Sequence, residues 1–575
     1  MKSSAMEKAL AWANNSDFDQ ESRNEIKALI EQNNTKEIEE RFYKDLEFGT
    51  GGMRSILGQG NNRINRYTIR RATQALCLEV LAQNKANPSI CLSYDSRNFS
   101  FEYAKVAAEV MAANGIKAYI YKRLNPVAML SFAVRYTKSL AGVMVTASHN
   151  PPEYNGYKVF WSDGAQVTPP NDQNIINHFN ALTDFSKIAF MPFNKAEEKG
   201  LIAWMGEEIE NEYHKIILDK AINQEFCQKN GSKLKIVYTP IHGAGLVPCT
   251  RALSELGFTD VNVVPEQAQP NGNFPTVKSP NPENPSALAM AVALMEKLDG
   301  DIAMGSDPDT DRLGVALKHE GIIQYLNGNQ IGILKLHYIL NEKKKQNKLS
   351  KNSYFVKTIV TTPLQDTIAK SFGVEVYNTL TGFKWICGKM NELEKTHPEK
   401  EFVFATEESF GYLSHNFARD KDGVSSVSVM AEVALYYKLQ NLNLFQALDK
   451  IYEEYGFSHE TLLSLDYFGI EGTEKIARIM KTFRSFNEPT MLGYKISEKK
   501  DYLATEKTGL PSSDVLGFFF ENGDQVYLRP SGTEPKIKFY IMIQETSGAL
   551  ADKKLKALAK TEQFLNYIKE LAEKA

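Results

Sequence analysis

The sequence predicts a layered α/β protein built from several domains. Short apolar runs rich in β-branched residues, at 90–94, 117–121 and 142–146, alternate with helical stretches near 69–81 and 101–113. This alternation is the pattern of an α/β domain. At 575 residues the chain exceeds what one hydrophobic core supports, so three or four domains are expected.

Two further blocks repeat the alternation. The second is expected to contain strands at residues 235–238, 261–264 and 301–304 and helices at 246–256 and 287–298. The third is expected to contain strands at residues 354–360 and 402–405 and helices at 329–340 and 364–372. Three blocks of about one hundred residues each agree with the usual size of a domain.

The two ends of the chain differ from these blocks. An amphipathic helical region runs to about Leu46, and residues 48–54 form a flexible glycine-rich loop that carries Arg54. Near the other end, a smaller α+β domain is predicted by a run of turn-linked strands before a long amphipathic helix. The expected elements are strands at residues 515–521, 525–528 and 537–543 and a helix at 548–573.

The composition is that of an ordinary globular protein, with 43% apolar and 24% charged residues. The 67 basic and 70 acidic residues nearly cancel, which argues against a nucleic-acid binder that relies on a strong positive field. No signal peptide or membrane-length apolar run is found, so we expect a cytoplasmic location without membrane partners. The five cysteines are far apart and form no CxxC pair, so we expect reduced, mostly buried thiols.

A serine follows the strand at 142–146. Ser148 lies between this run and the Pro151-Pro152 pair, which stops the regular structure. Open α/β sheets bind ligands at strand ends, so the Ser148 hydroxyl is a candidate nucleophile. On local composition alone, an ordinary Ser/Asn/Pro turn is the alternative.

Three carboxylates follow the strand at 301–304. Asp307, Asp309 and Asp311 alternate in a short loop that contains a proline. Closely spaced carboxylates repel one another without a cation, and they offer the hard oxygen ligands that Mg²⁺ prefers. A magnesium site is therefore predicted. One alternative is an acidic turn without a metal. The other is a phosphatase with Asp307 as its nucleophile.

Two further segments follow strands and carry polar side chains. Residues 529–536, Arg-Pro-Ser-Gly-Thr-Glu-Pro-Lys, combine cationic groups, hydroxyls and an accessible glycine backbone, which suits an anion. The alternative is an ordinary β-turn that carries these polar side chains and binds no anion. Residues 405–412, Ala-Thr-Glu-Glu-Ser-Phe-Gly-Tyr, offer carboxylates and hydroxyls that could bind sugar hydroxyl groups.

Taken together and in this order, the four segments resemble those of the α-D-phosphohexomutase superfamily of phosphoglucomutases and phosphomannomutases. The resemblance covers essentially the whole chain. It implies three related α/β domains with mixed sheets and a smaller C-terminal α+β domain around a central cleft. With the strand pattern, it leads us to expect domains at residues 1–222, 223–327, 328–452 and 453–575.

The resemblance also implies roles for individual residues. Ser148 would carry the catalytic phosphoryl group and, with Asp307, Asp309 and Asp311, hold Mg²⁺. Lys158 and Arg54 would lie beside the transferring group. The expected substrate contacts are Arg312, Lys384, Glu407, Ser409, Arg529, Ser531, Gly532 and Thr533. Contacts from residues 419–423 are also expected, on weaker grounds.

The acid/base group is open between two residues. Lys158 needs a lowered pKa for this work, and we expect Arg54, Arg312 and Mg²⁺ to favour its neutral form. His149 is the chemical rival, because its ordinary pKa is already close to neutrality. A hydrogen bond that orders the loop is the preferred role for His149. His242 is expected to be structural.

The expected function is a phosphoglucomutase, which interconverts glucose 1-phosphate and glucose 6-phosphate through a phosphoserine and a bisphosphorylated sugar. Glucose 1,6-bisphosphate is the expected activator, and the chain is expected to be a monomer or a homodimer. The Glu-Glu-Ser-Phe-Gly segment resembles the glucose-type branch, which includes long-chain phosphopentomutases, and argues against mannose or glucosamine substrates. A phosphopentomutase, a glucose 1,6-bisphosphate synthase, a phosphatase and a sugar-phosphate sensor are the alternatives.

Overall fold

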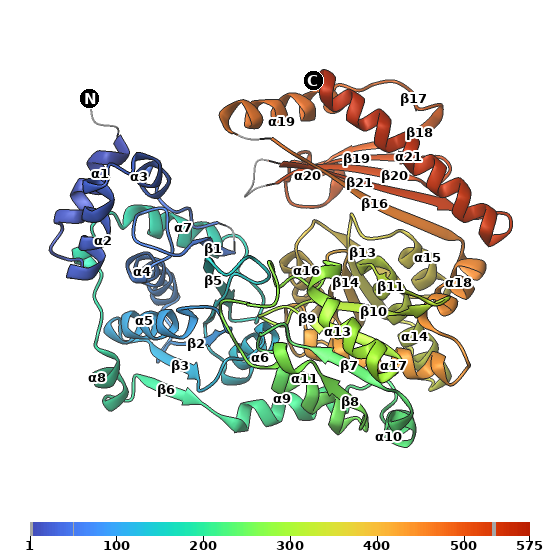
Figure 1. Ribbon diagram of the computed structural model, residues 1–575, viewed down its shortest axis with the longest axis horizontal. Coiled ribbons are helices and arrows are strands. Elements are labelled where there is room, and N and C mark those ends of the chain that lie inside the picture. The colour runs from blue at the N-terminus through green and yellow to red at the C-terminus, as the bar shows by residue number, and fades with distance from the viewer. Residues whose placement is uncertain (1–3, 50, 468, 532–535) are drawn as a thin grey trace. The chain divides into compact units, whose positions relative to one another are not determined.

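The computed structural model describes residues 4–49, 51–467, 469–531 and 536–575 (Figure 1). The chain forms two compact units. The first unit contains residues 1–326 and 411–435, and the second contains residues 327–410 and 436–575. Among the described residues, no helix combines the length and the apolar character needed to cross a membrane.

The first unit begins with three short helices, α1 (Ser4–Asn14), α2 (Gln20–Glu31) and α3 (Thr35–Phe42). They enclose a small aromatic core in which Trp12, Phe18 and Phe42 are buried. The expected helical region before Leu46 is therefore present, divided into three pieces. Tyr67 from the following α/β domain completes the same core.

The first α/β sheet has the strand order β1-β5-β4-β2-β3-β6. Its strands are β1 (Gly52–Ile56), β2 (Ser89–Tyr94), β3 (Lys117–Tyr121), β4 (Ala141–Val145), β5 (Tyr154–Trp161) and β6 (Ile202–Met205). Strands β4, β2, β3 and β6 are parallel, whereas β5 is antiparallel to both β4 and β1. The helices of this region are α4 (Arg66–Ala82), α5 (Ser100–Ala113), α6 (Val127–Thr137), α7 (Asn171–Ala181) and α8 (Phe193–Glu198).

One expectation for this domain is wrong in part. The glycine-rich segment around Arg54 is not a flexible loop, because Gly52–Ile56 forms β1 and pairs with β5. Gly52 allows this approach, since a Cβ atom there would lie 1.9 Å from the Tyr157 carbonyl oxygen. The proline pair interrupts regular structure only briefly, and the chain resumes as β5 at Tyr154. The segment that carries Lys158 is thus a strand.

The second sheet of the first unit has the order β11-β10-β9-β7-β8. Its strands are β7 (Ile236–Thr239), β8 (Val261–Val263), β9 (Ile302–Ser306), β10 (Leu313–His319) and β11 (Ile322–Leu326). Strands β8, β7 and β9 are parallel, and β10 and β11 add an antiparallel hairpin. Its helices are α9 (Glu207–Asp219), α10 (Gln224–Asn230), α11 (Leu246–Glu255), α12 (Pro265–Ala268) and α13 (Pro285–Leu298). The unit also contains β15 (Gly411–Leu413) and most of α17 (Gly423–Lys438).

The second unit begins with parallel strands in the order β13-β12-β14. These are β12 (Ser353–Thr358), β13 (Glu375–Thr379) and β14 (Glu401–Glu407). The helices of this part are α14 (Gly328–Lys345), α15 (Leu364–Ser371), α16 (Phe383–Thr396) and α18 (Leu444–Tyr455). Strand β12 is buried throughout, as expected of an interior parallel strand.

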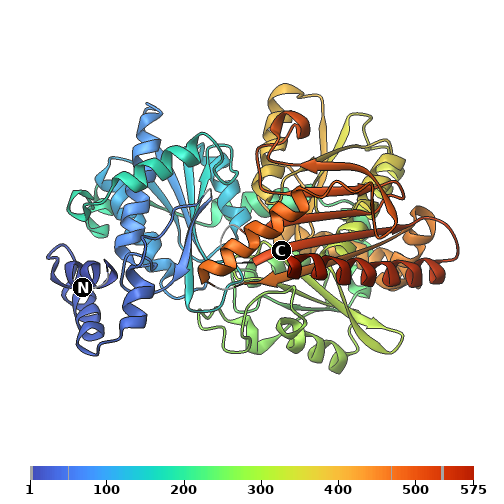
Figure 2. The same ribbon diagram turned by 90° about the horizontal axis from the view of Figure 1, so that it is seen from above.

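The C-terminal part of the second unit is an antiparallel sheet in the order β16-β21-β20-β19-β18-β17. Its strands are β16 (Phe457–Asp466), β17 (Thr490–Met491), β18 (Tyr494–Asp501), β19 (Leu516–Phe520), β20 (Gln525–Pro530) and β21 (Lys536–Glu545). Helices α19 (Gly469–Arg484) and α21 (Leu550–Lys574) pack on this sheet (Figure 2), and α20 (Thr505–Thr508) is a short helix. The three strands expected here correspond to β19, β20 and β21, and β16, β17 and β18 had not been anticipated.

Candidate active site

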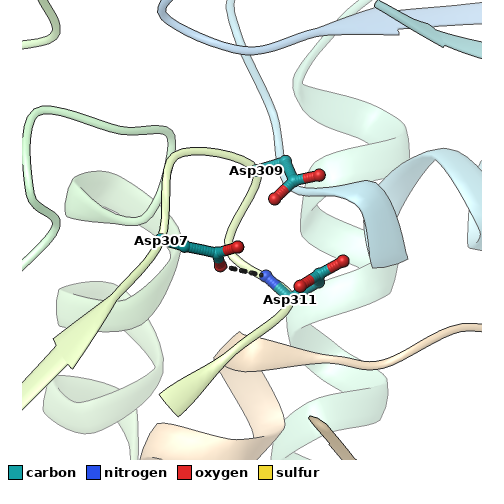
Figure 3. A group of neighbouring side chains, drawn as sticks. All are labelled: Asp307, Asp309 and Asp311. Atoms are coloured by element: carbon teal, nitrogen blue, oxygen red, sulfur yellow. Dashed lines mark hydrogen bonds between the residues drawn. The ribbon is translucent and has the colours of Figure 1, made fainter. Parts of the chain in front are cut away.

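Asp307, Asp309 and Asp311 project from the loop between β9 and β10 in the first unit (Figure 3). All three side chains are buried, and each offers a carboxylate oxygen within 4.8 Å of the others. The Oδ1 atom of Asp307 accepts hydrogen bonds from the backbone N–H groups of Asp311 and Arg312, at 2.9 and 3.0 Å. These bonds fold the loop tightly, so that three acidic groups share one small volume.

The triad has the chemistry of a cation site. The Oδ1 atoms of Asp309 and Asp311 are buried and have no hydrogen-bond partner among the described residues. Burial raises the pKa of Asp307 well above its usual range, and the charges of Asp311 and Asp309 raise it further. A small divalent cation that takes oxygen ligands would bind the buried oxygens that lack a donor. Its positive charge would also offset the repulsion among the carboxylates. The donor set therefore fits the metal expected from the sequence.

Ser148 lies directly against this triad. Its Oγ atom donates a hydrogen bond to Oδ2 of Asp307 at 3.1 Å. The residue follows β4, has a φ of 54° and is 3% exposed. A serine in the left-handed region is uncommon, and such conformations concentrate at functional sites. The bend turns the hydroxyl from the end of β4 toward the carboxylates.

Basic groups surround the carboxylates of the triad. On β5, Lys158 places Nζ 2.7 Å from Oδ2 of Asp309 and 3.7 Å from Oδ2 of Asp311. On β1, Arg54 donates from Nη1 to the Asn150 side chain at 3.0 Å. Strands β1 and β5 are neighbours, so the antiparallel part of the sheet brings both cations to the Ser148 loop.

The expected lowering of the Lys158 pKa is wrong for this arrangement of side chains. Burial by itself lowers the pKa of Lys158, but the Asp309 and Asp311 carboxylates outweigh burial and raise it. In return, Lys158 overcomes the effect of burial on Asp309 and lowers the pKa of that carboxyl to about 2. The pair is therefore held as an ammonium and a carboxylate.

His149 has a different environment. Burial lowers the pKa of His149 well below its usual range, and Arg312 and Arg54 lower it further. Its Nδ1 atom lies 3.1 Å from Oγ of Ser148, and its carbonyl oxygen accepts a hydrogen bond from Ser279 at 2.8 Å. The ring is thus neutral at pH 7 and bonded within the loop. His242, expected to be structural, lies within hydrogen-bonding distance of the Gln269 carbonyl and the Thr276 hydroxyl.

The segment 419–423 divides into two roles. The Arg419 side chain is buried and donates to the carbonyls of Asn416 and Ala418, which fits a structural role and not the expected substrate contact. Lys421, by contrast, places Nζ 3.2 Å from Oδ2 of Asp311. Lys421 therefore lies beside the triad, within the segment from which contacts with the substrate were expected. Arg312 pairs with Glu283 at the end of the same loop.

The structure also shows an acid and an arginine that had been missed. Asp95 and Arg97 directly follow β2 and are buried, and Arg97 donates to the backbone of the Ser148 loop. The sequence carried a signal for them, because oppositely charged residues at a buried strand end are seldom accidental.

The remaining expected residues lie in the second unit. Oε1 of Glu407, at the end of β14, accepts a hydrogen bond from the Gly382 N–H at 2.8 Å. Burial raises the pKa of the adjacent Glu408 to about 7, with Glu407 raising it further and Arg529 opposing the rise. Glu407 and Arg529 therefore both lie close enough to Glu408 to affect its charge.

For the five other expected contacts, the structure gives less information. Lys384 lies near the start of α16, with Nζ 4.9 Å from the centre of the Trp385 ring. Ser409 follows β14, and the Ser531 N–H donates to the Lys536 carbonyl at 2.8 Å. Gly532 and Thr533 lie outside the described residues.

Three segments match domains of one family. Residues 45–185 match alpha/beta/alpha domain I of the phosphoglucomutase/phosphomannomutase family, residues 211–321 match domain II, and residues 327–455 match domain III. These three matches cover the region that contains Ser148, the aspartate triad and the Glu407 segment.

Curated relatives extend the similarity to most of the chain. The chain is 36% identical over 530 residues to a phosphoglucomutase of Staphylococcus aureus (strain MRSA252), covering 90% of this chain and 93% of the relative. It is 34% identical over 531 residues to a phosphoglucomutase of Staphylococcus epidermidis (strain ATCC 12228), covering 90% and 94%.

Solved structures share the fold. Parafusin, a phosphoglucomutase from Paramecium crystallised in an open form, has a TM-score of 0.69 at 18% identity, covering 92% of this chain and 96% of that one. A phosphoglucomutase/phosphomannomutase family protein from Burkholderia thailandensis has a TM-score of 0.64 at 18% identity, covering 90% and 97%. The expected fold class, three α/β domains followed by a C-terminal α+β domain, is confirmed. The chain belongs to the phosphoglucomutase/phosphomannomutase family.

Proposed function

We propose that the protein is a Mg²⁺-dependent phosphoglucomutase that interconverts glucose 1-phosphate and glucose 6-phosphate. Membership of the family and relatives named phosphoglucomutase support phosphoryl transfer on a hexose phosphate. The observation that carries the mechanism is the hydrogen bond from Ser148 to Asp307, at the edge of a buried carboxylate triad. A nucleophilic hydroxyl beside a cation site is what a reversible phosphoryl carrier needs.

In the proposed cycle, phosphorylated Ser148 transfers its phosphoryl group to the free hydroxyl of the sugar phosphate. The product is a bisphosphorylated sugar, and Ser148 then accepts the other phosphoryl group. Mg²⁺ held by Asp307, Asp309 and Asp311 would supply positive charge for the transferring group. Glucose 1,6-bisphosphate is proposed as the activator, because it can phosphorylate an unloaded Ser148.

The chain's own side chains have distinct tasks in this scheme. Lys158 and Arg54 stabilise negative charge beside Ser148, and Lys158 is the proposed acid/base group. His149 is its rival, since it is already neutral and contacts the Ser148 hydroxyl. Residues proposed to bind the sugar and its second phosphate are Arg312, Lys384, Glu407, Ser409, Arg529, Ser531, Gly532 and Thr533.

The test is a coupled assay with Mg²⁺ and catalytic glucose 1,6-bisphosphate, run beside intact-mass analysis. The wild-type chain should turn over glucose 1-phosphate and carry one phosphate on Ser148, and Ser148→Ala should lose both. Ser254→Ala is the matched control, because Ser254 is an exposed serine on α11 of the same unit. Turnover in Ser148→Ala together with its loss in Asp307→Asn would favour a phosphatase with an aspartate nucleophile.

The identity of the sugar needs its own comparison. Glucose 1-phosphate should turn over faster than ribose 1-phosphate and mannose 1-phosphate, and a preference for ribose 1-phosphate would identify a phosphopentomutase. We further propose that the protein is cytoplasmic and is a monomer or a homodimer. Light scattering of the purified chain tests the second proposal.

A further inference from the structure

A buried ion pair lies behind the Ser148 loop. Asp95 and Arg97 follow β2, and their charged groups are fully shielded from solvent. Nε of Arg97 lies 3.5 Å from Oδ2 of Asp95, and the backbone N–H of Arg97 donates to Oδ1 of the same carboxylate at 3.0 Å. The guanidinium also lies over the Phe274 ring, 5.0 Å from its centre. Such contacts leave Arg97 little freedom to move.

The guanidinium of Arg97 binds the backbone of the Ser148 loop at four carbonyl groups. Its Nη2 atom donates to the carbonyl oxygen of Ser148 at 2.6 Å and also to that of Asn150. Its Nη1 atom donates to the carbonyl oxygens of Pro151 and Tyr154, at 2.8 and 3.1 Å. The planar guanidinium therefore binds the loop both before and after the proline pair begins.

The loop needs contacts from outside because few backbone hydrogen bonds form within it. Residues 147–153 lie between β4 and β5, and Pro151 and Pro152 have no N–H group to donate. Inside this segment, the Asn150 N–H donates to the Ala147 carbonyl, and at its end the Tyr154 N–H of β5 donates to the Pro151 carbonyl. The left-handed φ of Ser148 must consequently be stabilised by contacts from outside the loop.

Asp95 fixes the loop from its other side through Thr146. Oδ2 of Asp95 accepts a hydrogen bond from the Thr146 hydroxyl at 2.6 Å, and that hydroxyl accepts one from the Ser148 N–H at 2.8 Å. The Ser100 hydroxyl donates to Oδ1 of Asp95 at 2.8 Å and holds the carboxylate in place. Ser148 is thus bound at its N–H through Asp95 and at its carbonyl by Arg97.

We propose that Arg97, oriented by Asp95, is a positioning residue that sets where the Ser148 hydroxyl lies relative to the aspartate triad. It contacts none of the reacting atoms. Its effect passes through the backbone of Ser148, and the inference therefore rests on the proposed phosphoserine role of that residue. A displacement of about 1 Å at a reacting centre costs on the order of 10²-fold in rate.

Arg71 provides a matched control in the same domain. It is also buried, donates from Nε to the Phe179 carbonyl at 3.0 Å and from Nη1 to Asp45 at 3.0 Å, and lies over an aromatic ring. Its loss should destabilise the domain in the same way as the loss of Arg97. It makes no contact with the Ser148 loop that the structure records.

The experiment compares Arg97→Gln, Arg97→Lys and Arg71→Gln in the full-length protein with Mg²⁺ and glucose 1-phosphate. Arg97→Gln should lower kcat by about 10²-fold while KM changes little. Arg97→Lys should recover part of the loss, because one ammonium replaces some of the donors. Amide hydrogen exchange of residues 147–154 should rise in Arg97→Gln and remain at the wild-type level in Arg71→Gln.

Two results separate this inference from the proposed function. Turnover in Ser148→Ala would contradict the phosphoserine mechanism. With that turnover lost, equal kcat and equal hydrogen exchange in Arg97→Gln and Arg71→Gln would overturn the positioning role.

Two smaller substitutions at Thr146 test the inference even if an Arg97 variant does not fold. Thr146→Val removes the hydroxyl between Asp95 and the Ser148 N–H but keeps the side-chain volume, and Thr146→Ser restores the hydroxyl. A lower kcat in the valine variant that serine rescues supports the inference. Wild-type kcat in the valine variant would show that the Asp95 connection does not position Ser148.

Discussion

The hydroxyl of Ser148 donates a hydrogen bond to Oδ2 of Asp307 at 3.1 Å, although 159 residues separate the two in the chain. Each residue follows an interior strand with one parallel neighbour, β4 for Ser148 and β9 for Asp307. Polar residues at the ends of parallel strands face the region where α/β sheets bind their ligands. Two sheets therefore each contribute one part of the proposed phosphoryl-transfer centre.

The first prediction concerns the charge of the triad. Asp307→Asn keeps the Oδ1 atom that accepts the loop N–H groups but removes one buried charge, so the metal-free protein should be no less stable than wild type. Mg²⁺ at one hundred times its Kd should stabilise the wild-type protein by about 2.7 kcal/mol. Asp307→Asn should lose most of this stabilisation and most turnover, as measured by thermal unfolding with and without Mg²⁺.

Asp301→Asn is the control for this measurement. Asp301 comes just before β9, whereas the triad follows the other end of this strand. Its side chain accepts a hydrogen bond from the Lys235 N–H at 2.7 Å. This variant should respond to Mg²⁺ as the wild-type protein does. An equal response to Mg²⁺ in Asp307→Asn would show that the triad is not the metal site.

The second prediction separates two effects of Lys158. Its ammonium contacts Asp309 and Asp311, so it competes with a metal ion for the same carboxylates. Lys158→Gln should therefore bind Mg²⁺ at least as tightly as wild type, by isothermal titration. Turnover should nevertheless fall by about 10²–10⁴-fold, the usual contribution of a general acid/base group.

The exposed Lys318 on β10 serves as the matched lysine. Lys318→Gln should leave both Mg²⁺ binding and turnover unchanged. Weaker Mg²⁺ binding in Lys158→Gln would mean that the lysine organises the carboxylates for the metal instead of competing with it. Full turnover in Lys158→Gln would leave His149 as the acid/base candidate.

The third prediction is a dependence of stability on pH. Burial and Glu407 raise the pKa of Glu408 to about 7, above the value of 4.5 that applies in the unfolded chain. The folded protein then holds the Glu408 proton more tightly than the unfolded chain does. Its stabilising contribution is complete below pH ~4.5 and is lost as the pH rises through ~7. Glu408→Gln should remove this loss, on the order of 1–3 kcal/mol.

Urea unfolding of wild type and Glu408→Gln at several pH values measures the difference. Glu401→Gln is the control, because Glu401 is an exposed residue at the start of the same strand, β14. The gap between wild type and Glu408→Gln should widen from pH ~5 to pH ~8, with wild type becoming the less stable protein. A constant gap would contradict the raised pKa.

The interior of the first two domains could be predicted well from the sequence. Strand β3 has the predicted limits, and β4 and β9 end at the predicted functional loops. Strands β4 and β9 are buried along their whole length and consist mostly of small and apolar residues, which is a clear signal of an interior strand. The triad was equally predictable, because adjacent carboxylates are hard to explain without a cation.

Half-exposed and tertiary features could not be predicted in this way. Strand β18 contains Lys-Ile-Ser-Glu-Lys-Lys and faces solvent along much of its length, so its pattern resembles that of a loop. Strand β1 is short and begins at a glycine, and only its pairing with β5 makes it a strand. The Arg97 contacts depend on the three-dimensional path of the Ser148 loop, which no local pattern contains.

The fourth prediction concerns Gly156, which lies on β5 between β1 and β4. A Cβ atom there would lie 2.6 Å from the Thr146 carbonyl oxygen and 2.7 Å from that of Met53, both backbone atoms that cannot move independently. Gly156→Ala should destabilise the protein by about 1–3 kcal/mol and lower kcat, because β5 carries Lys158 and closes the Ser148 loop. Gly388→Ala on α16 is the control: its Cβ would meet open space, and the helix should gain up to about 1 kcal/mol. Unchanged stability and kcat in Gly156→Ala would show that the three strands can separate without disturbing the site.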